Sequence, residues 1–193
     1  MLYNVIIKGG VFIIKGILIC GLNGAGKSTL SKALSEKIGW HFIDNENLFF
    51  ESNEENSPYK NPKTKEEAVK KLMDEVKEHK NFVFAAVRGD YGEEILPLYK
   101  YVFELKVPKE TRIKRIRERS FIKFGERMKE GGDLYESEEA FFKFCEERKE
   151  DYTEKWAKTF NVPYIILDGT NTTKENIGII LKYIESDFIE NTN

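Results

Sequence analysis

The segment from Gly21 to Thr29, GLNGAGKST, holds the residues best suited to chemistry in this chain. It matches the pattern G-x-x-x-x-G-K-[ST] at every fixed position. Its glycines let the backbone N–H groups turn inward around an anion, where a Cβ would crowd a phosphate. A helix that starts near Lys27 directs the positive end of its dipole at the same anion. The segment, called the phosphate loop below, therefore predicts a site for the phosphates of a nucleotide.

Individual roles follow from the chemistry of the side chains. Lys27 is placed to reach the β- and γ-phosphates, and the Ser28 hydroxyl to bind Mg²⁺. The residues expected to bind ATP in this loop are Asn23, Gly24, Ala25, Gly26, Lys27, Ser28 and Thr29. The alternative is a glycine-rich turn that ends in Gly-Lys-Ser by chance. The apolar run 16–20 before the loop, which predicts a buried strand, and an amphipathic helix after it that ends at Gly39 favour the phosphate site.

Apolar and amphipathic segments alternate along the rest of the chain. The predicted strands are 16–20, 40–43, 81–87, 101–107 and 163–167, and the helices after the first one are 64–79, 108–120, 137–158 and 172–186. This alternation indicates an α/β protein, in which about five parallel strands are covered by helices on both faces. Residues 1–15 precede this unit, as an extra edge strand or as a loose extension. Residues 47–63 predict a loop or a small insertion that carries Phe49, Phe50 and Tyr59.

Polar side chains follow three other predicted strands at their carboxyl ends, where parallel sheets bind ligands. They are Asp44 and Glu46, Arg88 and Asp90, and Asp168 and Thr170. Asp44 is suited to bind Mg²⁺ through water or to accept a proton from a phosphate acceptor. Its alternative role is to cap a turn at the end of the strand. Arg88 is suited to bind an anionic group of the acceptor, and Glu46 and Asp90 are further candidates for acceptor binding.

Charge is distributed unevenly in the second half of the chain. Residues 109–129 hold nine Lys or Arg and three Glu, and residues 130–154 hold ten acids and three bases. Such segments form either two helices that pair with each other or an arginine cluster that meets a phosphate. Arg112, Arg115 and Arg119 are spaced to share one helical face, and Arg127 follows in a segment with glycines that can hinge. Arg148 stands in an apolar stripe and needs a partner, either a carboxylate or a phosphate.

These features together resemble the P-loop small-molecule and nucleotide kinases, the adenylate-kinase-like and shikimate-kinase-like group. The resemblance spans about residues 16–187, and it implies a three-layer P-loop NTPase fold with a mobile helical lid over residues 115–137. It implies that Arg115, Arg119 and Arg127 are lid arginines that act on the phosphates, and that Asp44 lies near Mg²⁺ or the acceptor hydroxyl. It also implies that the turn from Asp168 to Asn171 lies near adenine, that residues 1–15 are an N-terminal extension, and that 47–63 are an insertion on the acceptor side.

The predicted function is transfer of the γ-phosphate of ATP-Mg to a small acceptor such as a nucleoside, a nucleotide or a related metabolite. One alternative is an ATP-binding hydrolase or regulatory switch without an acceptor. A transporter ATPase is a second, but its Leu-Ser-Gly-Gly signature and hydrophobic-Asp-Glu strand end are missing from the sequence. The net charge of -2 and the lack of a long apolar run argue against nucleic-acid and membrane partners. With two cysteines and no export signal, we expect a cytoplasmic monomer or homodimer.

Overall fold

Five parallel strands form the central sheet of the chain. A computed structural model describes residues 4–7, 10–13, 15–50 and 62–190. The strands of the sheet are β3 (Lys15–Cys20), β4 (His41–Asp44), β5 (Asn81–Ala85), β6 (Tyr99–Lys106) and β7 (Tyr164–Asp168). Their order is β4-β5-β3-β6-β7, so that β3 lies in the middle, and every neighbouring pair is parallel. The predicted α/β class and the number of strands are confirmed.

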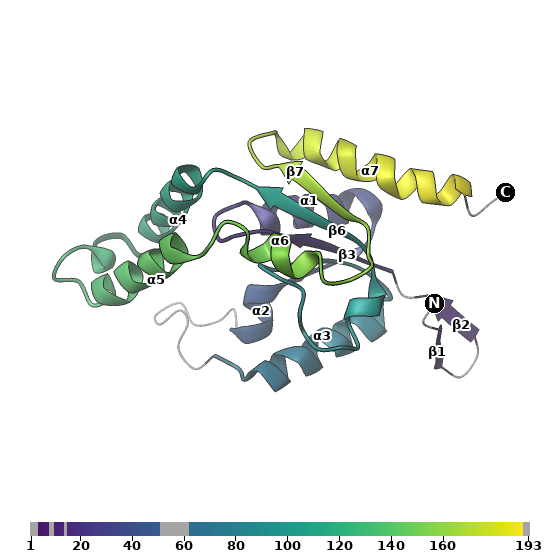
Figure 1. Cartoon of the computed structure of the whole chain (residues 1–193). Coiled ribbons are helices and arrows are strands. Elements are labelled where there is room, and N and C mark those ends of the chain that lie inside the picture. The colour runs from purple at the N-terminus through teal and green to yellow at the C-terminus, as the bar shows by residue number, and fades with distance from the viewer. Residues whose placement is uncertain (1–3, 8–9, 14, 51–61, 191–193) are drawn as a thin grey trace.

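Helices cover both faces of this sheet, and two of them extend beyond its carboxyl edge (Figure 1). The helices are α1 (Lys27–Ile38), α2 (Asn45–Phe49), α3 (Lys65–His79), α4 (Lys109–Phe124), α5 (Tyr135–Glu147), α6 (Tyr152–Ala157) and α7 (Thr173–Glu190), with 3-10 turns at Leu96–Leu98 and Gly125–Met128. On one face α1 and α7 pack through Leu30, Leu34 and Ile180 against β3 and β6. On the other face α3 and α6 pack through Leu72 and Trp156. Each fully buried aliphatic side chain contributes about 1.5–3 kcal/mol to folding.

Local signals set the ends of these helices where the sequence predicts them. The side chain of Thr64 accepts the Glu67 N–H, while the Glu67 carboxylate accepts the Thr64 N–H, which forms the predicted capping box of α3. Gly39 adopts a left-handed conformation at the end of α1, where an L side chain is strained. These caps fix where α3 begins and where α1 ends.

Two segments differ from the sequence prediction. Residues 45–49 form the short helix α2, where a loop was expected from residue 47 onward. The single helix predicted over 137–158 is divided into α5 and α6, because Arg148 adopts an extended conformation at the end of α5. At this break, Arg148 and Glu150 bond to residues that are distant in the sequence.

The N-terminal segment contains a two-stranded antiparallel sheet of its own, made of β1 (Asn4–Ile7) and β2 (Gly10–Ile13). It therefore adds no strand to the central sheet. Most of the predicted insertion at 47–63, including Tyr59, lies outside the described residues. Within the part of the chain that the structure describes, no helix has the length and apolar character needed to cross a membrane.

Candidate active site

The phosphate loop connects the central strand β3 to α1 and packs tightly against the base of α4. Gly21 and Gly24 have positive φ angles of 139° and 79°. A Cβ at Gly21 would lie 2.6 Å from the Leu105 carbonyl oxygen, and one at Gly24 would lie 2.4 Å from the Arg112 carbonyl oxygen. Close backbone packing therefore requires glycine at both positions, in addition to the need to leave room for a phosphate.

Lys27 lies at the start of α1, and its Nζ donates to the Leu22 carbonyl oxygen at 3.1 Å. Loss of hydration is the main reason why the pKa of Lys27 falls to about 8. The charge of Asp44 raises this pKa, whereas Arg119 and Arg148 lower it, so all three lie near the ammonium group. A poorly hydrated ammonium beside two guanidinium groups gains stability from an anion, as a phosphate site requires.

A cleft of about 520 Å³ opens beside the phosphate loop. The loop, α2, the start of α3 and the segments after β5 and α5 contribute its lining residues Asn23, Asn45, Phe49, Lys65, Val87, Arg88, Asp90, Tyr91, Arg148 and Tyr152. Four residues predicted from the sequence, Asn23, Arg88, Asp90 and Arg148, thus meet in one cleft. The strand ends bring Asn23, Arg88 and Asp90 together, as the parallel sheet predicts, whereas Arg148 reaches the cleft from the end of α5.

Two arginines of this cleft contact the same aromatic ring. The guanidinium groups of Arg88 and Arg148 lie 4.5 Å and 5.0 Å from the centre of the Tyr152 ring. Arg88 pairs with Asp90 at 2.5 Å, whereas Arg148 donates to the neutral Asn23 Oδ1 at 2.9 Å. Burial lowers the pKa of Arg148, and nearby Arg88 and Arg112 lower it further. Arg148 has no carboxylate partner among the described residues, so it is available to an anionic ligand.

Asn45 is a cleft residue that sequence reasoning missed. Its Oδ1 atom is buried and finds no hydrogen-bond partner within the described residues. Such an oxygen is costly to leave unpaired, so a ligand hydroxyl or amine in the cleft would stabilise it. Tyr91 and Tyr152 were also not predicted as cleft residues. The position of Asn45 directly after Asp44, at the end of a strand, was the one available signal.

Asp44 serves as the N-cap of α2, where its Oδ1 accepts the Glu46 N–H at 2.9 Å. Its charge also acts on Lys27. One carboxylate oxygen thus has the capping role considered from the sequence, and a role of Asp44 beside a metal or an acceptor stays a prediction. Neither Asp44 nor Glu46 lines the cleft.

The lid was predicted over residues 115–137; the two helices that carry this segment, α4 and α5, span residues 109–147, and the word lid is used below for that whole range. The predicted lid arginines lie in different surroundings. Arg115 and Arg119 are exposed on α4, and Arg119 lies close enough to Lys27 to affect its pKa. Arg127 is paired with Asp133 within the lid at 2.7 Å. Arg112, expected to share their face, is instead buried. Arg117 bonds to Glu139 on α5 at 2.7 Å, so part of the charged pattern holds the two helices together.

The remaining predicted residues lie on the turn after β7. Asp168 Oδ1 accepts the backbone N–H of Thr170 at 2.8 Å and also its hydroxyl, and this bonding lowers the pKa of Asp168. Asp168 and Thr170 are exposed, whereas the buried Gly169 between them donates its N–H to the carbonyl oxygen of Lys106, on the neighbouring strand β6, at 2.7 Å. Its role near adenine stays a prediction.

The site fits a metal ion that arrives with a nucleotide better than a resident one. Among the described residues, no group of three or more His, Cys, Asp or Glu side chains is placed to hold a metal ion. The Ser28 hydroxyl is exposed at the start of α1. Mg²⁺ usually keeps several waters and takes only one or two ligands from the protein beside substrate phosphates. One or two protein ligands such as Ser28 would suit Mg²⁺ that arrives with ATP, and the metal-binding roles of Ser28 and Asp44 stay predictions.

A phosphate loop after the central strand of a β4-β5-β3-β6-β7 sheet, with a helical lid after β6, defines the fold of the P-loop kinases that act on nucleotides and small molecules. The deoxyadenosine kinase from M. mycoides matches with a TM-score of 0.51 at 21% identity, over 89% of this chain and 99% of that one. A gluconokinase from Sinorhizobium meliloti 1021 matches with a TM-score of 0.56 at 15% identity, over 91% and 97%. A sugar kinase from Janibacter sp. HTCC2649 matches with a TM-score of 0.51 at 18% identity, over 89% and 95%. At these identities the likeness establishes the fold.

Sequence comparison places the chain more narrowly. A family model described as AAA domain matches residues 17–140, and the chain belongs to this family. The chain is also 24% identical over 183 residues to the uncharacterized protein YqaC from Bacillus subtilis (strain 168), which covers 90% of this chain and 99% of that protein. The resemblance to P-loop kinases that the sequence shows is thus confirmed for the fold and the phosphate loop.

Proposed function

We propose that this chain is an ATP-dependent phosphotransferase that moves the γ-phosphate of ATP to a small acceptor. The observation that carries this proposal is the cleft beside the phosphate loop, which Asn23 of the loop shares with Arg88 and Arg148. A hydrolase or a regulatory switch needs a nucleotide site and water, but it does not need a second binding space of this size. The kinase fold of the similar structures supports the same assignment.

The residues of the loop and the lid divide the work of phosphoryl transfer, which is mainly positioning and neutralisation of charge. Backbone N–H groups of residues 23–29 hold the phosphates, and Lys27 neutralises charge on the β- and γ-phosphates. Arg148 and Arg119 stabilise the charge of the transferred group, and Arg115 and Arg127 join them when the lid closes. Ser28 and Asp44 would hold Mg²⁺, which would supply further neutralisation of the phosphate charge. The turn with Asp168 and Thr170 contacts the adenine.

The chemistry of the cleft defines what the acceptor must offer. Arg88, fixed by Asp90, binds an anionic or strongly polar group, and Asn45 Oδ1 accepts a hydrogen bond from a hydroxyl or amine. Phe49, Tyr91 and Tyr152 give the cleft aromatic walls. A nucleoside, a nucleotide or a related metabolite has this combination. Asp44 does not line the cleft, but it directly precedes the cleft residue Asn45 and its charge acts on Lys27, so it is the candidate to accept the proton of the acceptor hydroxyl, with Glu46 as a further acceptor-side candidate.

The test is phosphoryl transfer from ATP labelled at the γ-phosphate to separate pools of nucleosides, nucleoside monophosphates and sugars. We expect a labelled product in at least one pool with the wild-type chain and none with Lys27→Ala. Release of labelled phosphate without a product in any pool would contradict the proposal and establish a hydrolase instead. Tight ATP binding with neither reaction would establish a regulatory switch.

A further inference from the structure

Asn23 of the phosphate loop is held by one arginine from each end of the lid. Its carbonyl oxygen accepts a hydrogen bond from Arg112 at 3.3 Å, and its Oδ1 accepts one from Arg148 at 2.9 Å. Arg112 lies in the first turn of α4, where the chain enters the lid. Arg148 directly follows α5, where the chain leaves it. The phosphate loop is thus bonded to both connections of the lid at a single residue.

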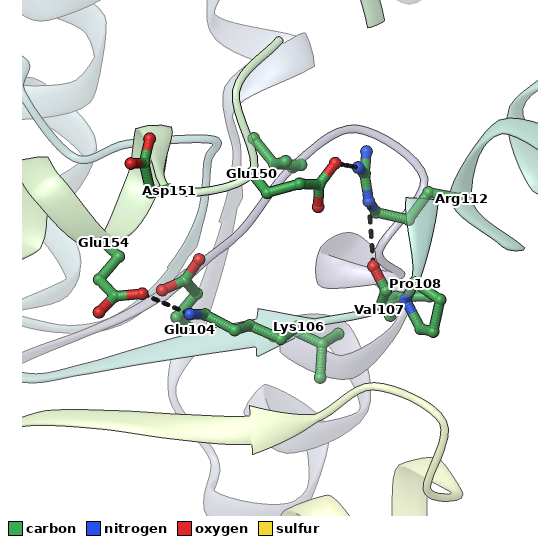
Figure 2. Close-up of a pocket in the computed structure, with 10 residues that line it drawn as sticks. Glu104, Lys106, Val107, Pro108, Arg112, Glu150, Asp151 and Glu154 are labelled. Atoms are coloured by element: carbon green, nitrogen blue, oxygen red, sulfur yellow. Dashed lines mark hydrogen bonds and ion pairs between the residues drawn. The ribbon is translucent and has the colours of Figure 1, made fainter. Parts of the chain in front are cut away.

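Arg112 extends these bonds to the connecting segments themselves. Figure 2 shows its guanidinium group between the Glu150 carboxylate and the Val107 carbonyl oxygen, at 2.5 Å and 3.1 Å. The Arg112 residue is only 1% exposed, whereas 58% of the Glu150 side chain is exposed. A buried guanidinium costs several kcal/mol unless its donors are satisfied, and here each of its three nitrogens bonds to an acceptor from a different segment. The arrangement therefore specifies geometry more than it adds stability.

A cavity separates the two connections of the lid. It has a volume of about 440 Å³, and Val107 and Pro108 line it on one side while Glu150 and Asp151 line it on the other (Figure 2). Farther along the lid, Ile116 of α4 packs on Phe142 and Cys145 of α5, but at this cavity no such packed cluster joins the two connections among the described residues. The ion pair of Arg112 with Glu150 spans this gap, so it sets the position of one connection relative to the other.

We propose that Arg112 is a positioning residue and that Glu150 is its partner. Together they fix the positions of Asn23 and both lid connections relative to one another before a nucleotide binds, and this arrangement is called the register below. This register keeps Arg148 at the phosphate loop, where it meets the transferred phosphate. Lysine cannot replace Arg112, because one ammonium group on a flexible stem does not match three acceptors that lie in different directions. The kinetic consequence of the proposal rests on the proposed function, whereas the geometric consequence does not.

The test compares Glu150→Gln with Glu139→Gln. Both carboxylates bond to an arginine of α4, but Glu150 does so at the lid connection and Glu139 within the lid. Spin labels at Glu130→Cys in the lid and Glu36→Cys on α1 report the distance between the lid and the sheet. Both native cysteines, Cys20 and Cys145, are buried, so labelling is selective. Without nucleotide, we expect Glu150→Gln to widen the distance distribution about twofold and Glu139→Gln to leave it unchanged.

The same variants have distinct kinetic expectations. Glu150→Gln and Arg112→Lys are expected to lower kcat about tenfold through misplacement of the arginines, with KM for ATP changed less than about twofold. Equal distance distributions for Glu150→Gln and Glu139→Gln would overturn the proposal, and so would a wider distribution with an unchanged kcat. If the wild-type chain phosphorylates no acceptor, the proposed function fails, and the distance measurement still decides the register. Glu150 is exposed, so this variant folds even if Arg112→Lys does not.

Discussion

The two cavities beside the phosphate loop differ in how one arginine of each, Arg112 and Arg148, is compensated, although Arg88 of the cleft is paired with Asp90. In the cavity between the lid connections, Arg112 pairs with Glu150 and Lys106 pairs with Glu154, each at 2.5 Å. Lys106 and Lys158 hold the pKa of Glu154 down to about 2. In the cleft on the other side, Arg148 has only the neutral Asn23 amide and aromatic rings as partners within the described chain. Cations of the first cavity are therefore satisfied by the protein, and Arg148 is not.

This difference separates arginines that build the site from arginines that bind. A buried arginine with carboxylate and carbonyl partners is part of the structure, because any ligand anion would have to displace those partners. A half-buried arginine without a carboxylate partner keeps its charge for a ligand. The type of residue is the same in both cavities, so the partners decide the role.

Lys27→Ala gives the largest expected effect. Removal of a charge that contacts the transferred phosphate should lower kcat/KM for ATP about 10³-fold. Within the described residues Lys27 donates one bond, to Leu22, and its buried ammonium is poorly hydrated, so loss of this side chain should not lower the unfolding free energy. Steady-state kinetics and urea unfolding measure the two effects, and Lys32→Ala on the exposed side of α1 is the matched control. A variant with a normal rate would remove Lys27 from the mechanism.

Arg148→Met and Arg112→Met test the comparison of the two cavities directly. Arg148→Met should lower kcat about 10²-fold with little loss of stability, because a binding residue is removed. Arg112→Met should lower the unfolding free energy by about 2 kcal/mol, because it leaves the buried Val107 carbonyl and the partly buried Asn23 carbonyl without this donor. Urea unfolding beside kinetics separates these losses. Equal destabilisation by the two variants would show that the cavities do not differ in this way.

Much of the fold was predictable because its signals are local. The capping box at Thr64, the glycine after α1 and the apolar strands depend on residues within a few positions of each other. The phosphate loop is likewise contiguous, so the site's centre was predictable too. The closeness of Arg88 and Asp90 to the phosphate loop was predictable too, because the carboxyl ends of parallel strands lie at one edge of the sheet.

Roles that depend on distant partners were not predictable from spacing. The apolar stripe continues through Cys145 and Tyr152, so periodicity predicts an unbroken helix across Arg148. The break is accompanied by bonds from Arg148 to Asn23, 125 residues away, and from Glu150 to Arg112, 38 residues away. The same spacing that groups Arg112 with Arg115 says nothing of burial, which the packing of α4 on the phosphate loop decides.

The smallest expected effect is a pH dependence of ATP binding that comes from Lys27. The folded pKa of Lys27 is about 8, below its ordinary value of 10.5, and ATP binds the protonated form. Affinity for ATP should therefore fall about tenfold per pH unit above pH 8. The unfolding free energy without nucleotide should instead rise from pH 8 towards pH 10.5, because in this range the unfolded chain binds a proton at Lys27 that the folded chain has lost. Calorimetric titration and urea unfolding between pH 7 and 9.5 measure the two trends. Lys27→Arg, whose guanidinium stays charged throughout this range, should abolish both pH trends. If ATP affinity and unfolding free energy changed in the same direction in the wild-type chain, the assignment to Lys27 would be contradicted.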